Sequence, residues 1–250
     1  MTQDHGRFRQ LIRKILYKPT IGTRWLNLRN AILSRACEAY YFRERRHSSD
    51  GLPLVADIGG IGKNQVGDLA GWGKVKVLTV NLYDDADIND DATTLEKIEE
   101  NSLDGIYSSH LIEHLWWWKT ADVLGVWYKK LKPRGRIELR CPDIEWIVKK
   151  SFEAYKNKKN SEVWEDILFH ITYGPSIVPW HRHYGNEGQH HRDLLWEDRL
   201  KDKLHQAGFR KVRRIYYFKN GLDHWPYDIT YPQFHGKILV RDLVMEGYKP

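Results

Sequence analysis

The sequence contains only two cysteines, Cys37 and Cys141, which lie far apart and follow no metal-binding or redox spacing. This excludes a disulfide-framework protein and a cysteine-rich zinc module. We expect both to be free thiols in a reducing compartment, although two cysteines can in principle pair.

Long apolar segments are also missing. The longest stretch without Asp, Glu, Lys or Arg is Ile167–His181, and His170, Gly174, Pro175 and Pro179 interrupt it. We therefore expect no transmembrane helix. The N-terminus has no uninterrupted apolar segment of the secretory type, so we expect a cytoplasmic protein.

Acidic residues are scarce in residues 1–50, and the whole formal net charge of +7 falls within that segment. Apolar residues recur at helical spacing over Phe8–Leu16 and Trp25–Arg46, so we predict a helical extension over residues 1–50. One interpretation is a basic amphipathic arm for an anionic membrane, an acidic glycolipid or nucleic acid, which would allow peripheral contact with the inner membrane surface. The alternative, which we favour, is a helical cap with its cationic side chains in solvent.

Residues 51–250 alternate between strand-like and helix-like patterns. The patterns predict strands at Leu54–Ile58, Lys74–Leu82, Leu103–Ser108 and Arg136–Arg140, and helices at Ser109–Leu115, Ala121–Leu131 and Leu194–Phe209. Such alternation favours a doubly wound parallel sheet, in which ligands bind at the carboxyl ends of the strands. Those ends here carry Asp57–Gly62, Asn81–Asp85, Ser108–His110 and Pro142–Asp143.

The glycine-rich segment DIGGIG, at Asp57–Gly62, follows an apolar strand. Glycine allows a sharp turn and lets a ligand approach the main chain closely. The acidic segment Asp84–Asp91 follows the second strand and is suited to hold a ribose, although a solvated turn would have the same composition.

Four segments, in this order along the chain, resemble the motifs of class I S-adenosylmethionine-dependent methyltransferases. They are DIGGIG, VNL…DADINDDAT, SLDGIYSSHLIEHL and LKPRGRIELRCPD. The likeness is greatest to the bacterial type found with polysaccharide- and sugar-modifying enzymes, and it covers about residues 52–245. It implies an α/β, Rossmann-like, seven-stranded sheet with an antiparallel last strand. Arg210–Phe218 and Gly236–Val244 fit the final two strands, and a lid insertion spans about 144–193.

The resemblance also implies where S-adenosylmethionine binds. The methionine part is expected to lie against Asp57, Gly59, Gly60 and Gly62. The Asn81–Asp85 turn is expected to meet the ribose. The remaining cofactor residues by resemblance are Asp91 and Ala92 for the adenine and Ser108 and Ser109 beside the methionyl group.

The sequence departs from the family pattern at two places. Ile61 and Lys63 stand where later glycines of D-x-G-x-G-x-G would fall, and Asn81 replaces the customary acid. These departures leave a non-catalytic, methyltransferase-like binding protein open as an alternative.

Methyl transfer to an alcohol needs a base, and histidine suits that task near neutral pH. One candidate group is His110 with His114. For His114 we favour a local structural role, through hydrogen bonds. The other is Tyr173–Asp193, a long segment rich in His, Gly and aromatic residues that we interpret as the substrate lid. There we predict His190 or His191 as the base.

The predicted acceptor contacts are His183, Tyr184 and Arg192 from this segment and Asp143 from the preceding rim. The H-x-H and H-H pairs of the segment could bind zinc, but no cysteine accompanies them, so we assign no metal.

We therefore predict an O-methyltransferase that uses S-adenosylmethionine and acts on a hydroxyl of a sugar or glycan, which a lipid or nucleotide could carry. Methylation of RNA or another polyanion is the second possibility. Because residues 51–250 carry no net charge, a nucleic-acid partner is not expected.

Overall fold

The structure, a computed structural model, describes residues 51–60, 72–82, 86–174, 190–215, 226–231 and 236–250, and the side chains of 226–241 are left aside. The predicted N-terminal extension lies outside these residues. In chain order the strands are β1 (Leu54–Ile58), β2 (Lys76–Asn81), β3 (Ile88–Asn89), β4 (Leu103–Ser109), β5 (Leu131–Pro142), β6 (Arg210–Arg214), β7 (Pro226–Tyr231) and β8 (Gly236–Tyr248). The helices are the single 3-10 turn η1 (Ile112–His114), α4 (Thr120–Lys130), α5 (Ile144–Asn157), α6 (Ser161–Tyr173) and α7 (Glu197–Gln206).

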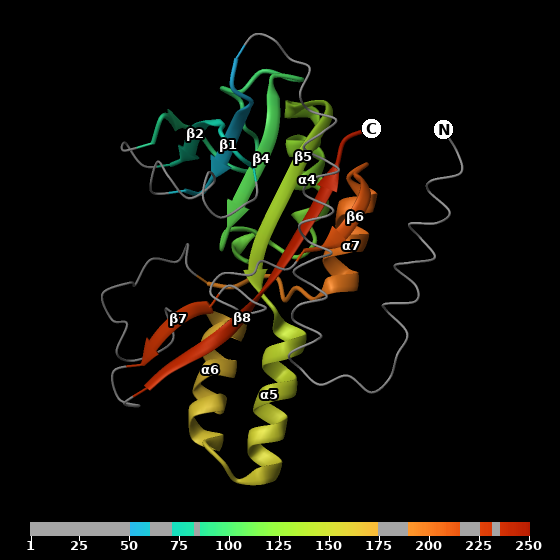
Figure 1. Ribbon diagram of the computed structural model, residues 1–250. Coiled ribbons are helices and arrows are strands. Elements are labelled where there is room, and N and C mark those ends of the chain that lie inside the picture. Colours follow the sequence, from blue (N-terminus) through green and yellow to red (C-terminus); the bar gives the residue numbers. More distant parts are fainter. Residues whose placement is uncertain (1–50, 61–71, 83–85, 175–189, 216–225, 232–235) are drawn as a thin grey trace, which may run out of the picture. The chain divides into compact units, whose positions relative to one another are not determined.

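The strands form a mixed sheet in the order β3-β2-β1-β4-β5-β8-β6 (Figure 1). Neighbours from β3 to β5 are parallel, whereas β8 is antiparallel to both β5 and β6. β7 pairs with the first part of β8 and lies off this path. Seven strands on one path, with β8 antiparallel, confirm the predicted doubly wound, Rossmann-like sheet.

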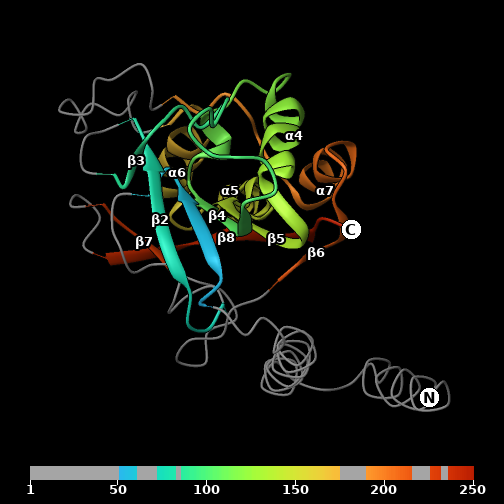
Figure 2. The same cartoon turned by 90° about the horizontal axis from the view of Figure 1, so that it is seen from above.

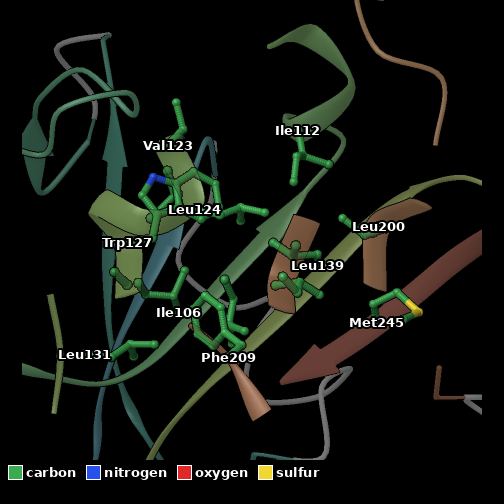
Figure 3. Packing of buried hydrophobic residues seen from close by; sticks show 14 of the residues in the cluster. Ile106, Ile112, Val123, Leu124, Trp127, Leu131, Leu139, Leu200, Phe209 and Met245 are labelled. Carbon is green, nitrogen blue, oxygen red and sulfur yellow. The ribbon is translucent and has the colours of Figure 1, made fainter. Parts of the chain in front are cut away.

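The main core lies between one face of this sheet and helices α4 and α7, which are adjacent (Figure 2). Because alternate strand residues point to the same face, Ile106 and Leu139 both meet this core. Figure 3 shows how Leu124 and Trp127 of α4 pack among them. Leu200 and Phe209 close the same cluster from α7 and the chain after it.

Helices α5 and α6 fill the first part of the predicted lid insertion. They pack on one another through a small apolar cluster of Ile144, Ile147, Ile167 and Ile171. The Asp143 side chain caps α5 by accepting a hydrogen bond from the Trp146 N–H at 3.2 Å. Residues 175–189 of the insertion lie outside the described part. No helix in the described part has the length and apolar character needed to cross a membrane.

Two predictions about local structure were wrong. The helix predicted over Ser109–Leu115 is only the single turn η1, because Leu111 offers no side-chain cap and Leu115 is extended. Residues 132–135, predicted to separate a helix from a strand, lie within β5, where the pairing register with β4 shifts.

Candidate functional site

The carboxyl ends of β1, β2, β4 and β5 lie along one rim of the sheet, because these strands are parallel neighbours. Asp57 is in register with Thr79 of β2 and Tyr107 of β4. The strand order continues from β1 to β2 and β3 on one side, and to β4 and β5 on the other. The order therefore reverses between β1 and β4, and this is the place where open α/β sheets bind ligands.

The turn after β1 depends on two glycines. Gly59 has φ +85°, a value that side chains rarely adopt, and its N–H donates to the Val80 carbonyl at 2.8 Å. A Cβ on Gly60 would lie 2.1 Å from Oδ2 of Asp57, so only glycine fits beside that carboxylate. Gly62, the third predicted glycine, lies outside the described residues.

Asp57 is almost fully buried, with 1% of its surface exposed. Its Oδ2 has no hydrogen-bond partner among the described residues. Burial raises the pKa of Asp57 to about 7. Oδ2 is therefore a buried acceptor available to a hydrogen-bond donor or a cation.

Asn81, where the family pattern has an acid, has a local structural role. Its Nδ2 donates to the Gly60 carbonyl at 2.8 Å and so ties the end of β2 to the glycine turn. A carboxylate has no donor and could not make this bond.

The predicted adenine residues follow β3. The Oδ1 of Asp91 accepts from the N–H and hydroxyl of Thr93, at 2.7 and 2.8 Å. The carbonyl of Ala92 accepts from the Trp127 indole N–H at 2.6 Å. The neighbouring carboxylate of Asp90 is buried and accepts from two backbone N–H groups. This segment is thus held in a fixed shape against α4.

The two serines differ in their surroundings. Ser108 is buried and its hydroxyl donates to the Ile58 carbonyl at 2.9 Å, which joins β4 to β1. Ser109 is half-buried at the strand end. Their predicted contact with the methionyl group stays a prediction.

His110 follows β4 directly with φ 51°, a strained value for a side chain of this kind. Its Nδ1 lies 3.2 Å from Oε1 of Glu113, and its Nε2 lies 3.4 Å from Oδ2 of Asp242 on β8. Burial alone would lower the pKa of His110, but the two carboxylates outweigh it and raise the pKa well above its usual range. Both ring nitrogens of His110 therefore face acids.

Glu113 is 2% exposed and sits between three histidines. Burial would raise its pKa, but the hydrogen bond and charge of His110, with smaller contributions from His114 and His191, lower the pKa below its usual value. The carboxylate is therefore ionised inside the protein.

The structure brings together the two histidine groups that the sequence presented separately. Nδ1 of His114 lies 3.2 Å from the His190 carbonyl, and the rings of His114 and His191 meet edge to face at 4.8 Å. The backbone N–H groups of Arg192 and Asp193 donate to the Glu113 carbonyl. The end of the insertion is thus bound to the segment that follows β4.

The remaining predicted acceptor residues differ in how the structure uses them. The Arg192 guanidinium lies 4.6 Å from the ring centroid of Trp116. Asp143 is buried, caps α5 and pairs with Arg214. His183 and Tyr184 lie outside the described residues.

Two buried acids of this region were not predicted from the sequence. Asp242 is an acid within the apolar run of β8, between Val240 and Leu243, and this position is buried. The buried carboxylate of Asp193 binds Thr120, Arg199 and Lys203 and fixes the end of the insertion on α4 and α7.

No protein-family model matches this sequence, and no curated protein matches it. Among solved structures, it is similar to an S-adenosylmethionine-dependent methyltransferase from Archaeoglobus fulgidus, with 17% identity and a TM-score of 0.46 over 86% of this chain and 94% of the other. A Thermotoga maritima S-adenosylmethionine-dependent methyltransferase gives 16% identity and a TM-score of 0.43 over 90% and 93%. Haemonchus contortus phosphoethanolamine N-methyltransferase 2 gives 15% identity and a TM-score of 0.44, over 86% of this chain and 52% of the other.

These likenesses concern the fold alone. The seven strands on one path and the antiparallel β8 of this chain agree with the Rossmann-like sheet that the sequence resemblance implies.

Proposed function

We propose that this protein is an S-adenosylmethionine-dependent methyltransferase that methylates a hydroxyl of a sugar or glycan. The observation that carries the proposal is the buried Asp57 carboxylate beneath the glycine turn. Its Oδ2 has no partner in the described part of the chain, and it lies where the strand order reverses.

The residues of this rim fit the cofactor. A buried carboxylate with a raised pKa gains a partner from a cationic donor, and the methionine end of S-adenosylmethionine carries an ammonium group. Asp57, Gly59 and Gly60 would hold that end, the turn after Asn81 the ribose, and Asp91 with Ala92 the adenine. When bound, the cofactor would supply an electrophilic methyl carbon on a sulfonium sulfur.

The protein must place the acceptor oxygen in line with that carbon and remove its proton. His110 has both ring nitrogens on carboxylates, so it is suited to orient the acceptor rather than to take its proton. The base then comes from the neighbouring pair His190 and His191, which the structure holds against His114.

A sugar acceptor is favoured by three exposed tryptophans that begin two residues after η1. Trp116, Trp117 and Trp118 have 44%, 56% and 52% of their surface exposed, and Arg192 covers the ring of Trp116. Large aromatic rings at a wet surface suit ligands with one apolar side and one hydroxyl-bearing edge.

Calorimetric titration with S-adenosylhomocysteine tests the cofactor site. We expect micromolar binding to the wild-type protein and at least about tenfold weaker binding to Asp57→Asn, because a charge-assisted contact contributes about 1.5–3 kcal/mol. Asp122→Asn, an exposed acid on α4, is the matched control and should bind normally. A folded wild-type protein that does not bind, or an Asp57→Asn variant that binds normally, would overturn the proposal.

The proposed acceptor is tested by measuring transfer of a labelled methyl group to sugar, lipid-linked and oligonucleotide acceptors. We expect transfer to a glycan, with His190→Ala lowering kcat while leaving the affinity for S-adenosylhomocysteine unchanged. Preferential labelling of an oligonucleotide would contradict the proposed glycan acceptor and indicate a polyanion acceptor.

A further inference from the structure

Glu113, His114 and His191 form a cluster of which the proposed methyl transfer names only His191, as one of two candidate bases. Glu113 and His114 belong to η1, and His191 lies in the segment that leads to α7. One donor atom from each of the three side chains lies within 4.8 Å of the others. Residues far apart in the sequence therefore converge with two imidazoles and one carboxylate.

Each imidazole is held from behind by a backbone carbonyl. Nδ1 of His114 lies 3.2 Å from the His190 carbonyl, and Nδ1 of His191 lies 2.5 Å from the Ile171 carbonyl. A carbonyl only accepts, so Nδ1 carries the proton in both rings and Nε2 is left with its lone pair. Metal-binding histidines are oriented in this way, with one nitrogen on a carbonyl and the other on the ion.

The carboxylate supplies the charge. Glu113 is almost fully buried, and its Oε2 has no hydrogen-bond partner among the described residues, whereas Oε1 faces Nδ1 of His110 at 3.2 Å. A buried carboxylate oxygen without a partner is costly, and a bound cation removes that cost. Oε1 can keep His110 while Oε2 takes the ion.

We propose that Glu113, His114 and His191 bind a divalent transition-metal ion of the zinc class. Two imidazole nitrogens and one carboxylate suit zinc better than Mg²⁺ or Ca²⁺, which prefer all-oxygen sites. With bonds of about 2.1 Å, the donors of a tetrahedral ion lie about 3.4 Å apart, so donors that are now within 4.8 Å of one another must draw closer on binding. Three protein ligands leave one tetrahedral position for water.

The ion would join the turn after β4 to the end of the insertion, beside His110. It would also occupy the remaining ring nitrogen of His191, which leaves His190 as the base of the pair. Only this last assignment depends on the proposed function; the metal site itself does not.

The test uses the untagged full-length protein, stripped with EDTA, dialysed and titrated with Co²⁺ and then Zn²⁺. We expect one Co²⁺ per chain with the visible absorption of a tetrahedral site, displaced by Zn²⁺. Glu113→Gln, His114→Asn and His191→Asn should each bind at least about tenfold more weakly, since even outer-sphere changes cost 10–100-fold. His205→Asn, an exposed histidine on α7, is the matched control.

Circular dichroism of each variant confirms that it is folded, and a smaller melting-temperature rise with Zn²⁺ in the three variants gives a second readout. A wild-type protein that binds no Co²⁺, or a His191→Asn variant that binds as tightly as His205→Asn, would overturn the site. Because neither readout uses the cofactor, failure of S-adenosylhomocysteine binding would count against the proposed function alone.

Discussion

The two faces of the sheet are both buried, yet they are built from different residues. The face against α4 and α7 is apolar and includes Ile58, Ile106 and Leu139. On the opposite face Arg136, Glu138 and Arg140 alternate along β5, and all three are at most 8% exposed. One strand therefore has aliphatic side chains on one side and an ion network on the other.

The ion network is tightly connected. Glu138 accepts from the guanidinium of Arg136 at 2.7 Å and from the Trp72 indole N–H at 3.2 Å. Arg136 also stacks over the Trp72 ring and pairs with Glu246 at 3.0 Å. Trp72 packs directly against Gly105, where a Cβ would meet the ring at 2.1 Å. Such a face gains its stability from mutual pairing, so the loss of one member affects the others.

The comparison matters for function because Asp57 belongs to the polar face. It lies two residues after Val55 and therefore on the same face, where Val55 packs on Trp72 and Tyr107, and it is in register with Tyr107. Asp57 differs from Glu138 in one respect: its Oδ2 has no partner among the described residues. The polar face thus contains both satisfied structural charges and one acceptor available to a ligand.

The largest change in stability is expected in the core between the apolar face and α4. Trp127→Ala should lower the free energy of unfolding by about 5 kcal/mol, because it opens a large cavity and leaves the Ala92 carbonyl without its donor. Urea unfolding measures this, with Trp127→Phe as a milder variant if the first does not fold. Tyr155→Ala, which changes a 73% exposed ring on α5, should stay within about 0.5 kcal/mol of wild type. Equal losses at both positions would contradict the assigned core.

The polar face should respond nearly as strongly. Glu138→Gln keeps the shape of the side chain but leaves Arg136 and Arg140 without their shared carboxylate, and it should cost about 4 kcal/mol. Glu162→Gln, near the exposed start of α6, should change little. A loss below about 1 kcal/mol for Glu138→Gln would mean that water, not Glu138, satisfies the two arginines.

Asp57 should make cofactor-free stability fall as pH rises. Its pKa of about 7 in the folded protein exceeds the ordinary value of 3.8, so between these values the folded state binds more protons than the unfolded state. The phenol of Tyr107 beside it, with a pKa raised to about 12 by burial, stays neutral over this range. Relative to Asp57→Asn, the wild type should lose about 3 kcal/mol between pH 4.5 and pH 8, at about 1.36 kcal/mol per pKa unit.

Urea unfolding of both proteins at several pH values isolates this difference from all other groups. If the two proteins show the same pH dependence, Asp57 is already ionised and paired in the folded protein, and it is not the acceptor for a ligand.

The sequence predicted the fold well because alternation and helical periodicity report burial on the apolar face. It predicted β2, β4 and α4 to within a few residues. It did not predict that Arg136, Glu138 and Arg140 are buried, since alternating charges in a strand are typical of a solvated face. Burial of these charges depends on Trp72 and Glu246, whose positions only the folded chain defines.

The candidate site was predictable in its glycine turn, because an apolar strand that ends in Asp57 and glycines has a local signature. The meeting of His114 with His190 and His191, and of His110 with Asp242, was not predictable. These contacts join residues far apart in the chain, and no periodicity in the sequence records such distances.

The smallest effect is expected at Asn81, and it distinguishes a ligand contact from a structural role in the glycine turn. If this position serves only as the ribose contact, then Asn81→Asp would restore the customary acid and tighten the binding of S-adenosylhomocysteine. We expect the reverse, about five- to tenfold weaker binding, because the variant loses a hydrogen bond worth about 1 kcal/mol to the Gly60 carbonyl and sets a carboxylate against that oxygen. Asn89→Asp is the matched control, since Nδ2 of Asn89 donates to the Leu82 carbonyl at 3.0 Å in an exposed position, where water can replace it. Calorimetry on both variants separates the two roles: tighter binding by Asn81→Asp would show that the side chain faces the ligand, whereas weaker binding with a normal Asn89→Asp would show that it holds the glycine turn beside Asp57.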